Sequence, residues 1–524
     1  MKTLKQIEEF FQAGGMAFRC ENSLDDRLIG QLHLDSRGVE PGDAFIALQG
    51  TQKHGLAFLA QVLDKQPGWV LSDRPLEGEE RSLWKRQAGQ CVFCWCEHLT
   101  EFLAALADWF YDSPSRNLKV VGITGTNGKT SSAFYTVQLL EHLGFRAALI
   151  GTLGNGNWRA LTPTQNTTPD VVSVQRLLAG FLHQGYEWVV MEVSSHALSL
   201  GRVDGVCFQT TALTQITRDH LDFHGSVESY REAKKSLFTG FDSTAQVLNL
   251  NDETGRELCE SNSLAHCFGY AIGEANQQVQ SESKSFLLCR RLQLYPEGML
   301  MHLHFAGVEA ELKVSLLGRF NAENVLCALS VLLANGFAWP DLVAGACRLK
   351  PVDGRMQRLC EQPAVVLDFA HTADALHSVL LAVREHLSAS RGKLWVLFGC
   401  GGNRDKGKRP LMAQVAEQLA DRVVVTSDNP RDERPDAILD EICEGFSPRA
   451  AVTRLEDRAE AIEWTLQQAD DDDLVVVAGK GHEAYQEIAG NKYPFSDAGV
   501  VKRFCRSATS PKTPEMQQRS ASDA

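Results

Sequence analysis

The sequence predicts an α/β protein of about three domains, built mainly on open and mostly parallel sheets. The chain has 524 residues, and domains of about 100–200 residues are usual. Mostly apolar runs such as 187–193 fit buried parallel strands. Beyond about residue 113 such runs alternate with helical stretches, and this alternation is typical of parallel sheets.

The composition excludes several classes of protein. Hydrophobic residues make up 44% and charged residues 23% of the chain, as in ordinary globular proteins. No apolar run reaches about 18 residues, and the first ten residues contain no apolar signal core. We therefore expect a cytoplasmic protein without a membrane span. The formal net charge of −14 argues against a general nucleic-acid binder.

The 14 cysteines are expected as reduced thiols, because no signal peptide is recognisable. Cys91, Cys94, Cys96 and His98 form the one tempting metal cluster. A structural zinc site usually brings a second ligand pair at a set distance, and none is evident. Small buried hydrophobic cysteines are therefore favoured over a zinc site.

The elements follow one another in a regular order. Residues 1–112 are expected to form a small α/β unit in which 41–48 is a turn leading into a strand. Residues 112–115 form a linker, 329–333 continue an apolar helix, and 350–355 form a second hinge. The last part has expected strands at 364–369, 393–398, 422–426 and 474–478. The polar tail 508–524 is expected to be disordered.

The segment 120–131, VVGITGTNGKTS, is the most informative part of the chain. An apolar strand runs into a glycine-rich turn, and a helical pattern follows at 132–143 with Gly144 as a stop signal. Backbone N–H groups there can surround phosphates, Lys129 adds a cation and Thr130 offers a hydroxyl to Mg²⁺. The segment predicts ATP binding. Only two residues separate Gly125 from Gly128, which argues against an ordinary kinase or GTPase.

Polar residues after the next strands suggest a metal. Glu192 ends a strand, where it can hold Mg²⁺ with the loop hydroxyl or simply cap a helix. The segment 217–225 contains Asp219, His220, Asp222 and His224, so that a zinc or two-metal hydrolase and a plain polar loop both remain open. By chemistry alone, Lys234 belongs to a solvated helix face.

Three loops follow strands of the last part, at 399–409, 428–431 and 479–483. The carboxyl ends of parallel strands lie at one edge of a sheet, so Arg404, Arg431 and Glu483 are expected to converge. Their mixed charges suit a zwitterionic amino acid. Three ordinary polar loops are the alternative.

Taken together, these segments resemble the Mur ligases of peptidoglycan precursor synthesis. The family's motifs occur in order from Leu34 to about Asp497: ITGTNGKTS, NTTP, MEVSSHAL, TRDHLDFHG, YREAK, GRFNAENV, DGRMQ, DFAHTADAL, FGCGGNRDKGKRP, DNPR and AGKGHE. The resemblance implies an N-terminal UDP-substrate-binding α/β domain at 1–112 and a central P-loop ATPase-like domain at 113–351. A Rossmann-like amino-acid-binding domain follows at 352–507.

The resemblance also implies a reaction. ATP activates the D-Glu γ-carboxylate of UDP-N-acetylmuramoyl-L-Ala-D-Glu as an acyl phosphate, and an amine of meso-diaminopimelate then attacks it. Two Mg²⁺ ions are implied, one held by Thr130 and Glu192 and one by His220 and a carbamylated Lys234. A monomer is expected, with small-molecule substrates only.

The remaining residues implied by the resemblance fall into three groups. The ATP site comprises Gly125, Thr126, Asn127, Gly128, Lys129, Thr130, Ser131, Asn321, Asn324, Arg355 and His371. The UDP-substrate site comprises Leu34, Ser36, Thr51, Gln52, Lys53, Asn166, Thr167, Thr168, Ser194 and Arg202. The diaminopimelate site comprises Arg404, Asp428, Asn429, Pro430, Arg431, Gly479 and Glu483.

One position departs from the family pattern, because Leu200 stands where many relatives carry Gln. Arg431 is expected to read the distal carboxylate of diaminopimelate, since an arginine fork fits a carboxylate. A lysine-adding enzyme would leave this arginine without its anion. The alternatives are that lysine-adding ligase, a folylpolyglutamate synthase-like ligase, or a nucleotide-regulated binding protein or NTPase switch.

Overall fold

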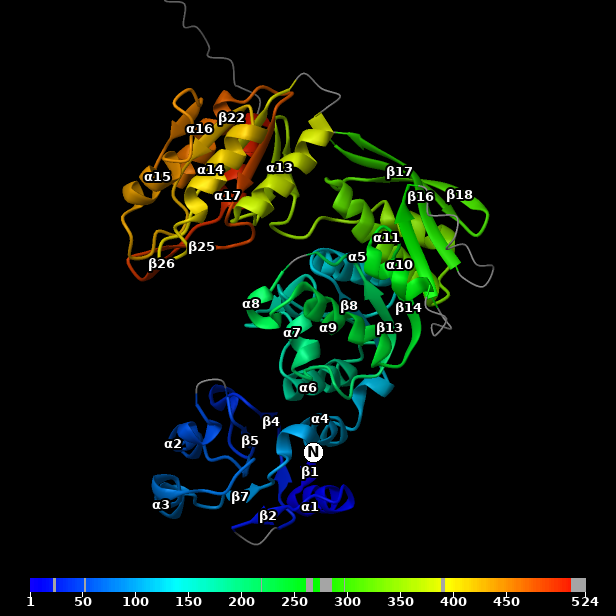
Figure 1. Ribbon diagram of the computed structural model, residues 1–524, viewed down its shortest axis with the longest axis vertical. Coiled ribbons are helices and arrows are strands. Elements are labelled where there is room, and N and C mark those ends of the chain that lie inside the picture. The colour runs from blue at the N-terminus through cyan, green and yellow to red at the C-terminus, as the bar shows by residue number, and fades with distance from the viewer. Residues whose placement is uncertain are drawn as a thin grey trace, which may run out of the picture. The chain divides into compact units, whose positions relative to one another are not determined.

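The computed structural model describes residues 1–21, 25–50, 53–217, 219–260, 267–273, 285–295, 297–387 and 392–509 (Figure 1). The chain separates into two compact units. The first unit consists of Met1–Arg290, Leu303–Ala310 and Glu323–Ala346. The second unit consists of Arg291–His302, Glu311–Ala322 and Cys347–Ala524.

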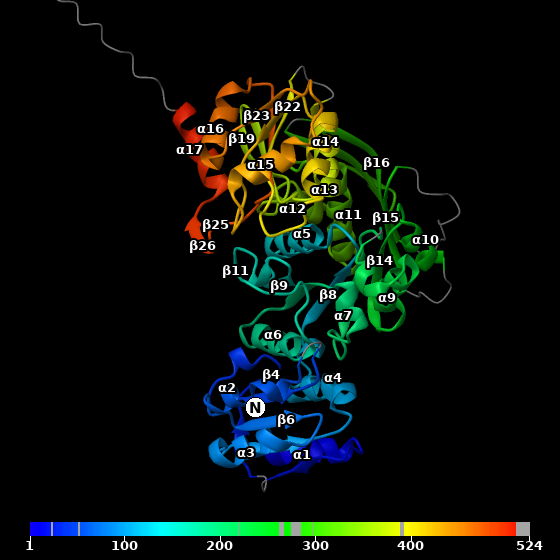
Figure 2. The same ribbon diagram turned by 60° about the vertical axis from the view of Figure 1, so that its left-hand side comes forward.

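The N-terminal part of the first unit is a five-stranded sheet with the order β2-β7-β6-β5-β4. Strands β4 to β7 are parallel, and β2 is antiparallel at the edge. Helices α1 and α4 bury apolar side chains on one face, and α2 and α3 on the other (Figure 2). The elements are β1 (Lys2–Thr3), α1 (Leu4–Ala13), β2 (Arg19–Cys20), β3 (Leu28–Ile29), β4 (Leu32–His33), η1 (Ser36–Gly38), β5 (Ala44–Ala47), η2 (Gly55–Phe58), α2 (Leu59–Leu63), β6 (Trp69–Ser72), α3 (Gly78–Gln87), β7 (Val92–Trp95), α4 (Leu99–Phe110) and η3 (Pro114–Arg116).

The central sheet has eleven strands in the order β11-β10-β9-β12-β8-β13-β14-β15-β16-β17-β18. Strand β8 carries the glycine-rich loop and lies between β12 and β13, to which it is parallel. These three strands are almost entirely buried, which explains the mostly apolar sequences of β8 and β12.

The elements of this region are β8 (Lys119–Thr124), α5 (Lys129–His142), β9 (Ala147–Gly151), β10 (Gly154–Asn157), β11 (Ala160–Thr162), α6 (Val171–His183), β12 (Trp188–Glu192), α7 (Ser195–Ser199), β13 (Phe208–Leu213), α8 (Leu221–His224), α9 (Val227–Thr239), β14 (Ser243–Asn249), α10 (Glu253–Glu260), β15 (Cys267–Ile272), β16 (Ser285–Tyr295), β17 (Gly298–Phe305), β18 (Val308–Val314), α11 (Arg319–Ala334) and α12 (Trp339–Ala346).

The sheet of the second unit has the order β19-β20-β24-β21-β22-β23. All its strands are parallel except the edge strand β19. Alternate strand residues pack against α13, α14 and α15 on one face and against α16 and α17 on the other. The elements are β19 (Gln357–Glu361), β20 (Ala364–Asp368), α13 (Ala373–Leu387), β21 (Leu394–Phe398), α14 (Lys408–Leu419), β22 (Arg422–Val425), α15 (Pro435–Cys443), β23 (Val452–Arg454), α16 (Arg458–Gln468), β24 (Leu474–Ala478), β25 (Tyr485–Ile488), β26 (Asn491–Pro494) and α17 (Asp497–Thr509).

The α/β class and the mostly parallel sheets are confirmed, and so is each expected strand to within a residue or two. The helix after the glycine-rich loop begins at Lys129, three residues before the expected start, because Gly128 already caps it. The expected tail begins inside α17, which continues to Thr509. From residue 510 the tail lies outside the described residues.

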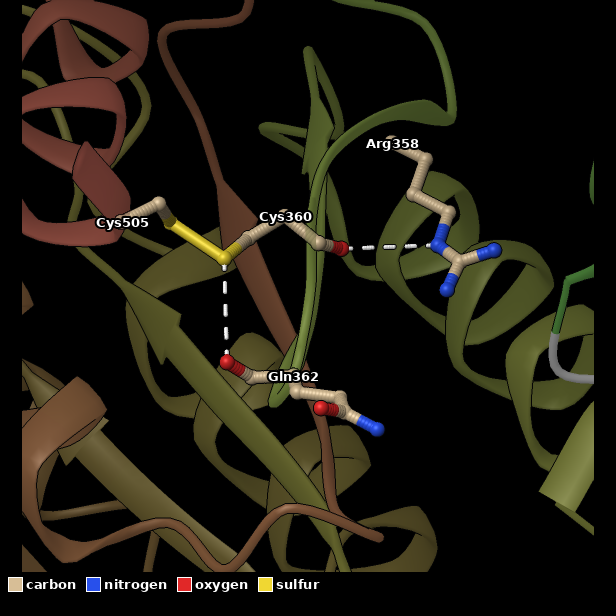
Figure 3. The surroundings of a disulfide bond; sticks show 4 residues. All are labelled: Arg358, Cys360, Gln362 and Cys505. Atoms are coloured by element: carbon tan, nitrogen blue, oxygen red, sulfur yellow. Dashed lines mark hydrogen bonds between the residues drawn. A yellow bond between two sulfur atoms is a disulfide. The ribbon is translucent and has the colours of Figure 1, made fainter. Parts of the chain in front are cut away.

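Two disulfides contradict the expectation that all cysteines are reduced. Cys20 bonds to Cys94 across β2 and β7, and Cys360 on β19 bonds to Cys505 on α17 (Figure 3). Sequence spacing does not show these neighbours, because 74 and 145 residues separate them.

The remaining residues of the possible zinc cluster do not form a site. Cys91 and Cys96 are buried thiols, as favoured, whereas the side chain of His98 is 68% exposed and lies near Glu101. In the described ranges no group of three or more His, Cys, Asp or Glu residues is arranged to hold a metal.

Candidate functional site

The loop 125–131 joins the carboxyl end of β8 to the first turn of α5. Gly128 has φ +85°, and a Cβ there would lie 2.3 Å from Oδ1 of Asn324, so only glycine fits. Nζ of Lys129 donates to the carbonyls of Gly125 and Thr126 at 2.8 Å each. The helix N-terminus and this ammonium create the positive potential that phosphates require. The loop therefore has the strand–loop–helix setting expected of an ATP site.

The loop hydroxyl and the strand-end carboxylate lie side by side. Oγ1 of Thr130 donates to Oε2 of Glu192 at 2.9 Å. Glu192 is 2% exposed, and the backbone and hydroxyl of Thr152 also donate to it. Ser194 caps α7, so the alternative in which Glu192 caps that helix is wrong. Hydroxyl and carboxylate oxygens are the ligand types that Mg²⁺ prefers.

Lys234 on α9 does not belong to a solvated face, and that interpretation is wrong. The residue is 2% exposed, and its Nζ donates to the carbonyl of Gly125 at 2.8 Å. Burial, reinforced by the nearby Lys129, lowers the pKa of Lys234 well below its ordinary value. The fold thus favours the neutral form of an amine beside the phosphate loop.

His220 lies near this lysine's helix but is more open. Its side chain is 49% exposed, and its Nε2 lies 3.4 Å from Oδ2 of Asp219. Its ring meets the ring of His196 edge-on at 4.8 Å. Within the described segments no group of three such residues is arranged to hold a metal. Arg218 and the side chain of Asp222 lie outside the described residues.

The predicted UDP-substrate residues lie in two places, at the NTTP turn beside the start of α7 and in the N-terminal sheet after β4. Thr168 is fully buried and donates to the Glu192 carbonyl, and its own carbonyl accepts from Nη1 of Arg202 at 3.1 Å. Ser194 donates its backbone N–H to the Thr168 hydroxyl, which connects the NTTP turn to the start of α7. Asn166 is exposed and Thr167 contacts Thr152.

In the N-terminal sheet, Leu34 and Ser36 follow β4, and the Ser36 hydroxyl donates to Gln61 at 3.3 Å. Lys53 is exposed, and Thr51 and Gln52 lie outside the described residues. Leu200, the departure from the family pattern, is 54% exposed.

The other predicted nucleotide residues occupy both units. Asn324 on α11 accepts from the Ser132 hydroxyl at 3.3 Å, next to the phosphate loop. Asn321, Arg355 and His371 belong to the second unit. There the Arg355 guanidinium lies 5.9 Å from the Phe369 ring centre. The role of these three residues in nucleotide binding stays a prediction.

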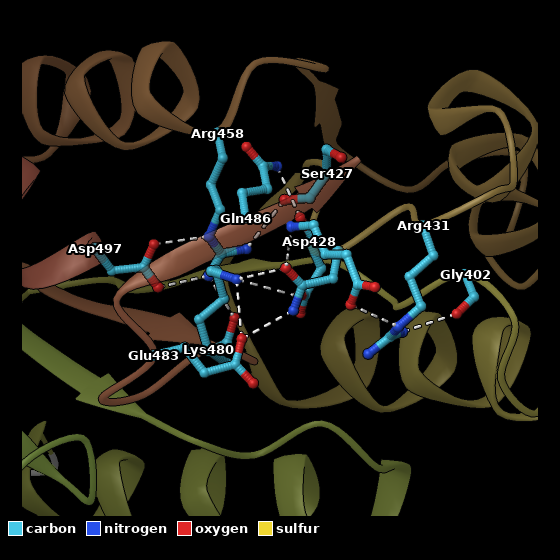
Figure 4. Close-up of polar contacts among 12 residues, drawn as sticks. Gly402, Ser427, Asp428, Arg431, Arg458, Lys480, Glu483, Gln486 and Asp497 are labelled. Carbon is cyan, nitrogen blue, oxygen red and sulfur yellow. Dashed lines mark hydrogen bonds and ion pairs between the residues drawn. The ribbon is translucent and has the colours of Figure 1, made fainter. Parts of the chain in front are cut away.

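Two loops of the second unit form one polar cluster (Figure 4). Asp428 and Asn429 follow β22, whereas Lys480 and Glu483 follow β24, two strands away in the sheet. Nδ2 of Asn429 donates to Oε2 of Glu483 at 2.8 Å. Burial raises the pKa of Asp428, which is 6% exposed. The expected convergence of these two loops is confirmed.

Arg431 has an anionic partner within the chain. Its Nε lies 3.2 Å from Oε2 of Glu487, and its Nη1 donates to the Gly402 carbonyl at 2.8 Å. The expectation that this arginine lacks an anion without diaminopimelate is therefore wrong, because β25 supplies one. A Cβ on Gly401 would lie 2.9 Å from Nη1 of Arg431 and 3.7 Å from Cγ of Arg404, so the two arginines flank that glycine.

Sequence reasoning missed several buried charges beneath these loops. Arg458, at the start of α16, forms a fully buried ion pair with Asp497, and its Nη2 also donates to the Ala478 carbonyl. Arg409 is buried against Glu433 and donates to the Gly401 carbonyl. Arg458 lies outside the three predicted loops, and Arg409 is the last residue of the loop 399–409. Nothing in the sequence shows that either guanidinium is buried.

Comparison with known proteins gives these motifs a family. The Mur ligase middle domain matches residues 123–332, and the Mur ligase glutamate ligase domain matches 354–481. A protein of Alkalilimnicola ehrlichii named UDP-N-acetylmuramoyl-L-alanyl-D-glutamate–2,6-diaminopimelate ligase is 44% identical, over 91% of this chain and 95% of its own length.

Further relatives have the same name. The one from Pseudomonas aeruginosa is 43% identical, over 91% of this chain and 95% of its own length. A solved structure of such a ligase is 32% identical, with a TM-score of 0.68 over 94% of this chain and 97% of that chain. No helix in the described ranges is long and apolar enough to cross a membrane.

Proposed function

The chain belongs to the Mur ligase family, and we propose that it joins meso-diaminopimelate to UDP-N-acetylmuramoyl-L-Ala-D-Glu in peptidoglycan precursor synthesis. The new amide forms on the D-Glu γ-carboxylate, and ATP becomes ADP and phosphate. The observation that carries this assignment is that Asn429, two residues before Arg431, donates to Glu483, so that a guanidinium and a carboxylate lie on connected loops. Together they match the carboxylate and ammonium at the distal end of diaminopimelate.

The phosphate loop prepares the first step. The γ-carboxylate attacks the γ-phosphate of ATP, which yields an acyl phosphate and ADP. Lys129 and the N–H groups that begin α5 hold the phosphate oxygens as charge moves toward the leaving ADP. No covalent enzyme nucleophile is required, so catalysis consists mainly of positioning and electrostatics.

Mg²⁺ is a general requirement of this reaction class, and when bound it neutralises phosphoryl charge. The oxygens of Thr130 and Glu192 fit a first ion, because they already lie within 2.9 Å of each other. A second ion would be held by Lys234, as its carbamate, together with His220. The buried position and lowered pKa of Lys234 support this, since only the neutral amine adds to CO₂.

In the second step the substrate amine attacks the acyl carbon and phosphate leaves. The second unit orients that amine by holding the other end of the amino acid. Glu483 takes the distal ammonium and Arg431 the distal carboxylate, with Arg404 as a further cation, since both arginines lie next to Gly401. The NTTP turn and the loop after β4 hold the UDP-linked substrate.

The decisive experiment measures ADP release with ATP and Mg²⁺ while the other substrates are varied. We expect release to require both the muramoyl dipeptide and diaminopimelate. Lysine in place of diaminopimelate tests the lysine-adding ligase, and folate substrates test the folylpolyglutamate synthase-like ligase. ADP release that ignores all acceptors would identify an NTPase switch and overturn the proposal.

A further inference from the structure

Lys480 is a fully buried ammonium that lies between the two amino-acid loops (Figure 4). Its Nζ donates to Oδ1 of Asn429 and to Oε2 of Glu483, each at 3.0 Å. It also lies 3.7 Å from Oδ1 of Asp428. The ammonium thus donates to one acceptor on its own loop and one on the loop after β22, and a second carboxylate of the latter loop lies within ion-pair distance.

These contacts fix which atoms of Glu483 remain available. Oε2 accepts from both Lys480 and Asn429. In the part of the chain that the structure describes, no donor reaches Oε1. The carboxylate is therefore held by one oxygen and presents the other. Its side chain is 23% exposed, so that second oxygen has access to solvent.

Asn429 is fixed by the same ammonium. Its Oδ1 accepts from Lys480 and from the backbone N–H of Glu487 at 2.9 Å, so both lone pairs are used. This orientation directs Nδ2 to Glu483. Without Lys480 the Asn429 amide and the Glu483 carboxylate lose the donor that they share.

The charge of the cluster requires this lysine as well. Three carboxylates, those of Asp428, Glu483 and Asp497, lie near the two buried cations Lys480 and Arg458. With all five ionised the cluster keeps one negative charge, enough to attract an ammonium. Removal of Lys480 leaves buried carboxylates with fewer partners, which is costly in a low dielectric.

We propose that Lys480 is a positioning residue for the amino-acid substrate: it holds Glu483 by Oε2 so that Oε1 receives the distal ammonium. The inference rests on the proposed function, in which Glu483 binds that group. Lys480 itself does not touch the substrate, because Glu483 and Asn429 surround its ammonium.

The test compares three amino acids that separate the two distal groups. Diaminopimelate has both groups, lysine lacks the distal carboxylate, and 2-aminopimelate lacks the distal amine. In Lys480→Met we expect kcat/KM for diaminopimelate and lysine to fall alike, by about 10–150-fold, mainly through KM, as for the loss of one charge-assisted hydrogen bond. The inhibition constant of 2-aminopimelate should change by less than about twofold.

Two further variants guard against misfolding. Lys480→Gln keeps a hydrogen-bond donor on a side chain of similar length, and its kcat/KM for diaminopimelate should fall less than that of Lys480→Met. Lys492→Gln removes an exposed lysine on β26, whose ammonium lies over the Tyr485 ring, and should behave as the parent enzyme. The ATP KM and the melting temperature of each variant report on damage to the fold.

The outcomes distinguish failure of the positioning role of Lys480 from failure of the assignment of Glu483 to the distal ammonium. Equal losses for all three amino acids, or a lower KM for diaminopimelate in Lys480→Met, would overturn the positioning role. If Glu483→Gln fails to reduce the preference for diaminopimelate over 2-aminopimelate, the assignment of Glu483 in the proposed function is wrong. The double variant Lys480→Met, Glu483→Gln should have nearly the same kcat/KM for diaminopimelate as Glu483→Gln alone, since both substitutions act on the same contact.

Discussion

Arg431→Ala should reduce the preference for diaminopimelate over lysine. In the structure the Gly402 carbonyl holds Nη1 and Glu487 lies beside Nε, so the guanidinium is fixed at two edges. The Nη2 edge remains for an incoming carboxylate. A charge-assisted contact is worth about 1.5–3 kcal/mol, which corresponds to about a 10–150-fold loss of selectivity.

Loss of the Arg431–Glu487 ion pair should destabilise the Arg431→Ala variant only slightly. Glu487 loses its cation in the variant, but its side chain is 25% exposed, so water solvates it at small cost. Lysine carries no distal carboxylate, and its kcat/KM should therefore stay near that of the parent enzyme. Arg431→Lys keeps the charge without the fork and should recover only part of the selectivity.

The assay follows ADP release at saturating ATP and muramoyl dipeptide while the amino acid is varied. Arg434→Ala is the matched control, because this exposed arginine, three residues further along, forms its ion pair with Asp436 and not with the amino-acid loops. A diaminopimelate-to-lysine ratio within about twofold of the parent value would refute the reasoning and point to Arg404. A comparable rise in the ATP KM would instead show that the variant damages more than the amino-acid site.

Three other predictions concern separate parts of the chain. Lys129→Ala should abolish turnover, because the phosphate loop loses its ammonium, and full ligase activity in this variant would mean that the ATP site is misplaced. Lys234→Ala should be nearly inactive and partly rescued by short-chain carboxylic acids, and an unmodified Lys234 in both the mass spectrum and the electron density of active enzyme would rule out the carbamate. Arg409 lowers the pKa of Glu433 to about 2, so their pair stabilises the fold above the ordinary carboxyl pKa and is lost as pH falls toward 2. The melting-temperature difference between the parent and Arg409→Met should therefore be larger at pH 6 than near pH 2, and a constant difference would contradict this.

The fold was largely predictable because its signals are local. Strands such as β12 and β24 are buried on both faces, so their sequences are continuously apolar and stand out. Gly128 marks the start of α5 by its own backbone requirement. The two disulfides were not predictable, because residues distant in sequence meet only after folding.

The site was predictable where a motif itself carries the chemistry, as in the phosphate loop. It was not predictable where burial decides the role. By residue chemistry alone Lys234 and Lys480 are ordinary lysines, and only the family resemblance singled out Lys234. Their desolvation depends on helices and strands packed from elsewhere. Glu487 gave no signal either, because its meeting with Arg431 depends on how a hairpin folds back.

That hairpin has a consequence for engineering. Backbone bonds join Arg431 to Glu487 and to Ala489, and Arg431 is held at φ +50° between them. The specificity element is therefore one piece in space but two pieces in sequence. If the DNPR segment alone were exchanged for that of a ligase with another substrate, the new side chains would pack against a β25–β26 hairpin that does not match them. Transplanting 428–431 together with 479–494 would move these backbone contacts as a unit, and the loop with Gly402, whose carbonyl also accepts from Arg431, would have to match.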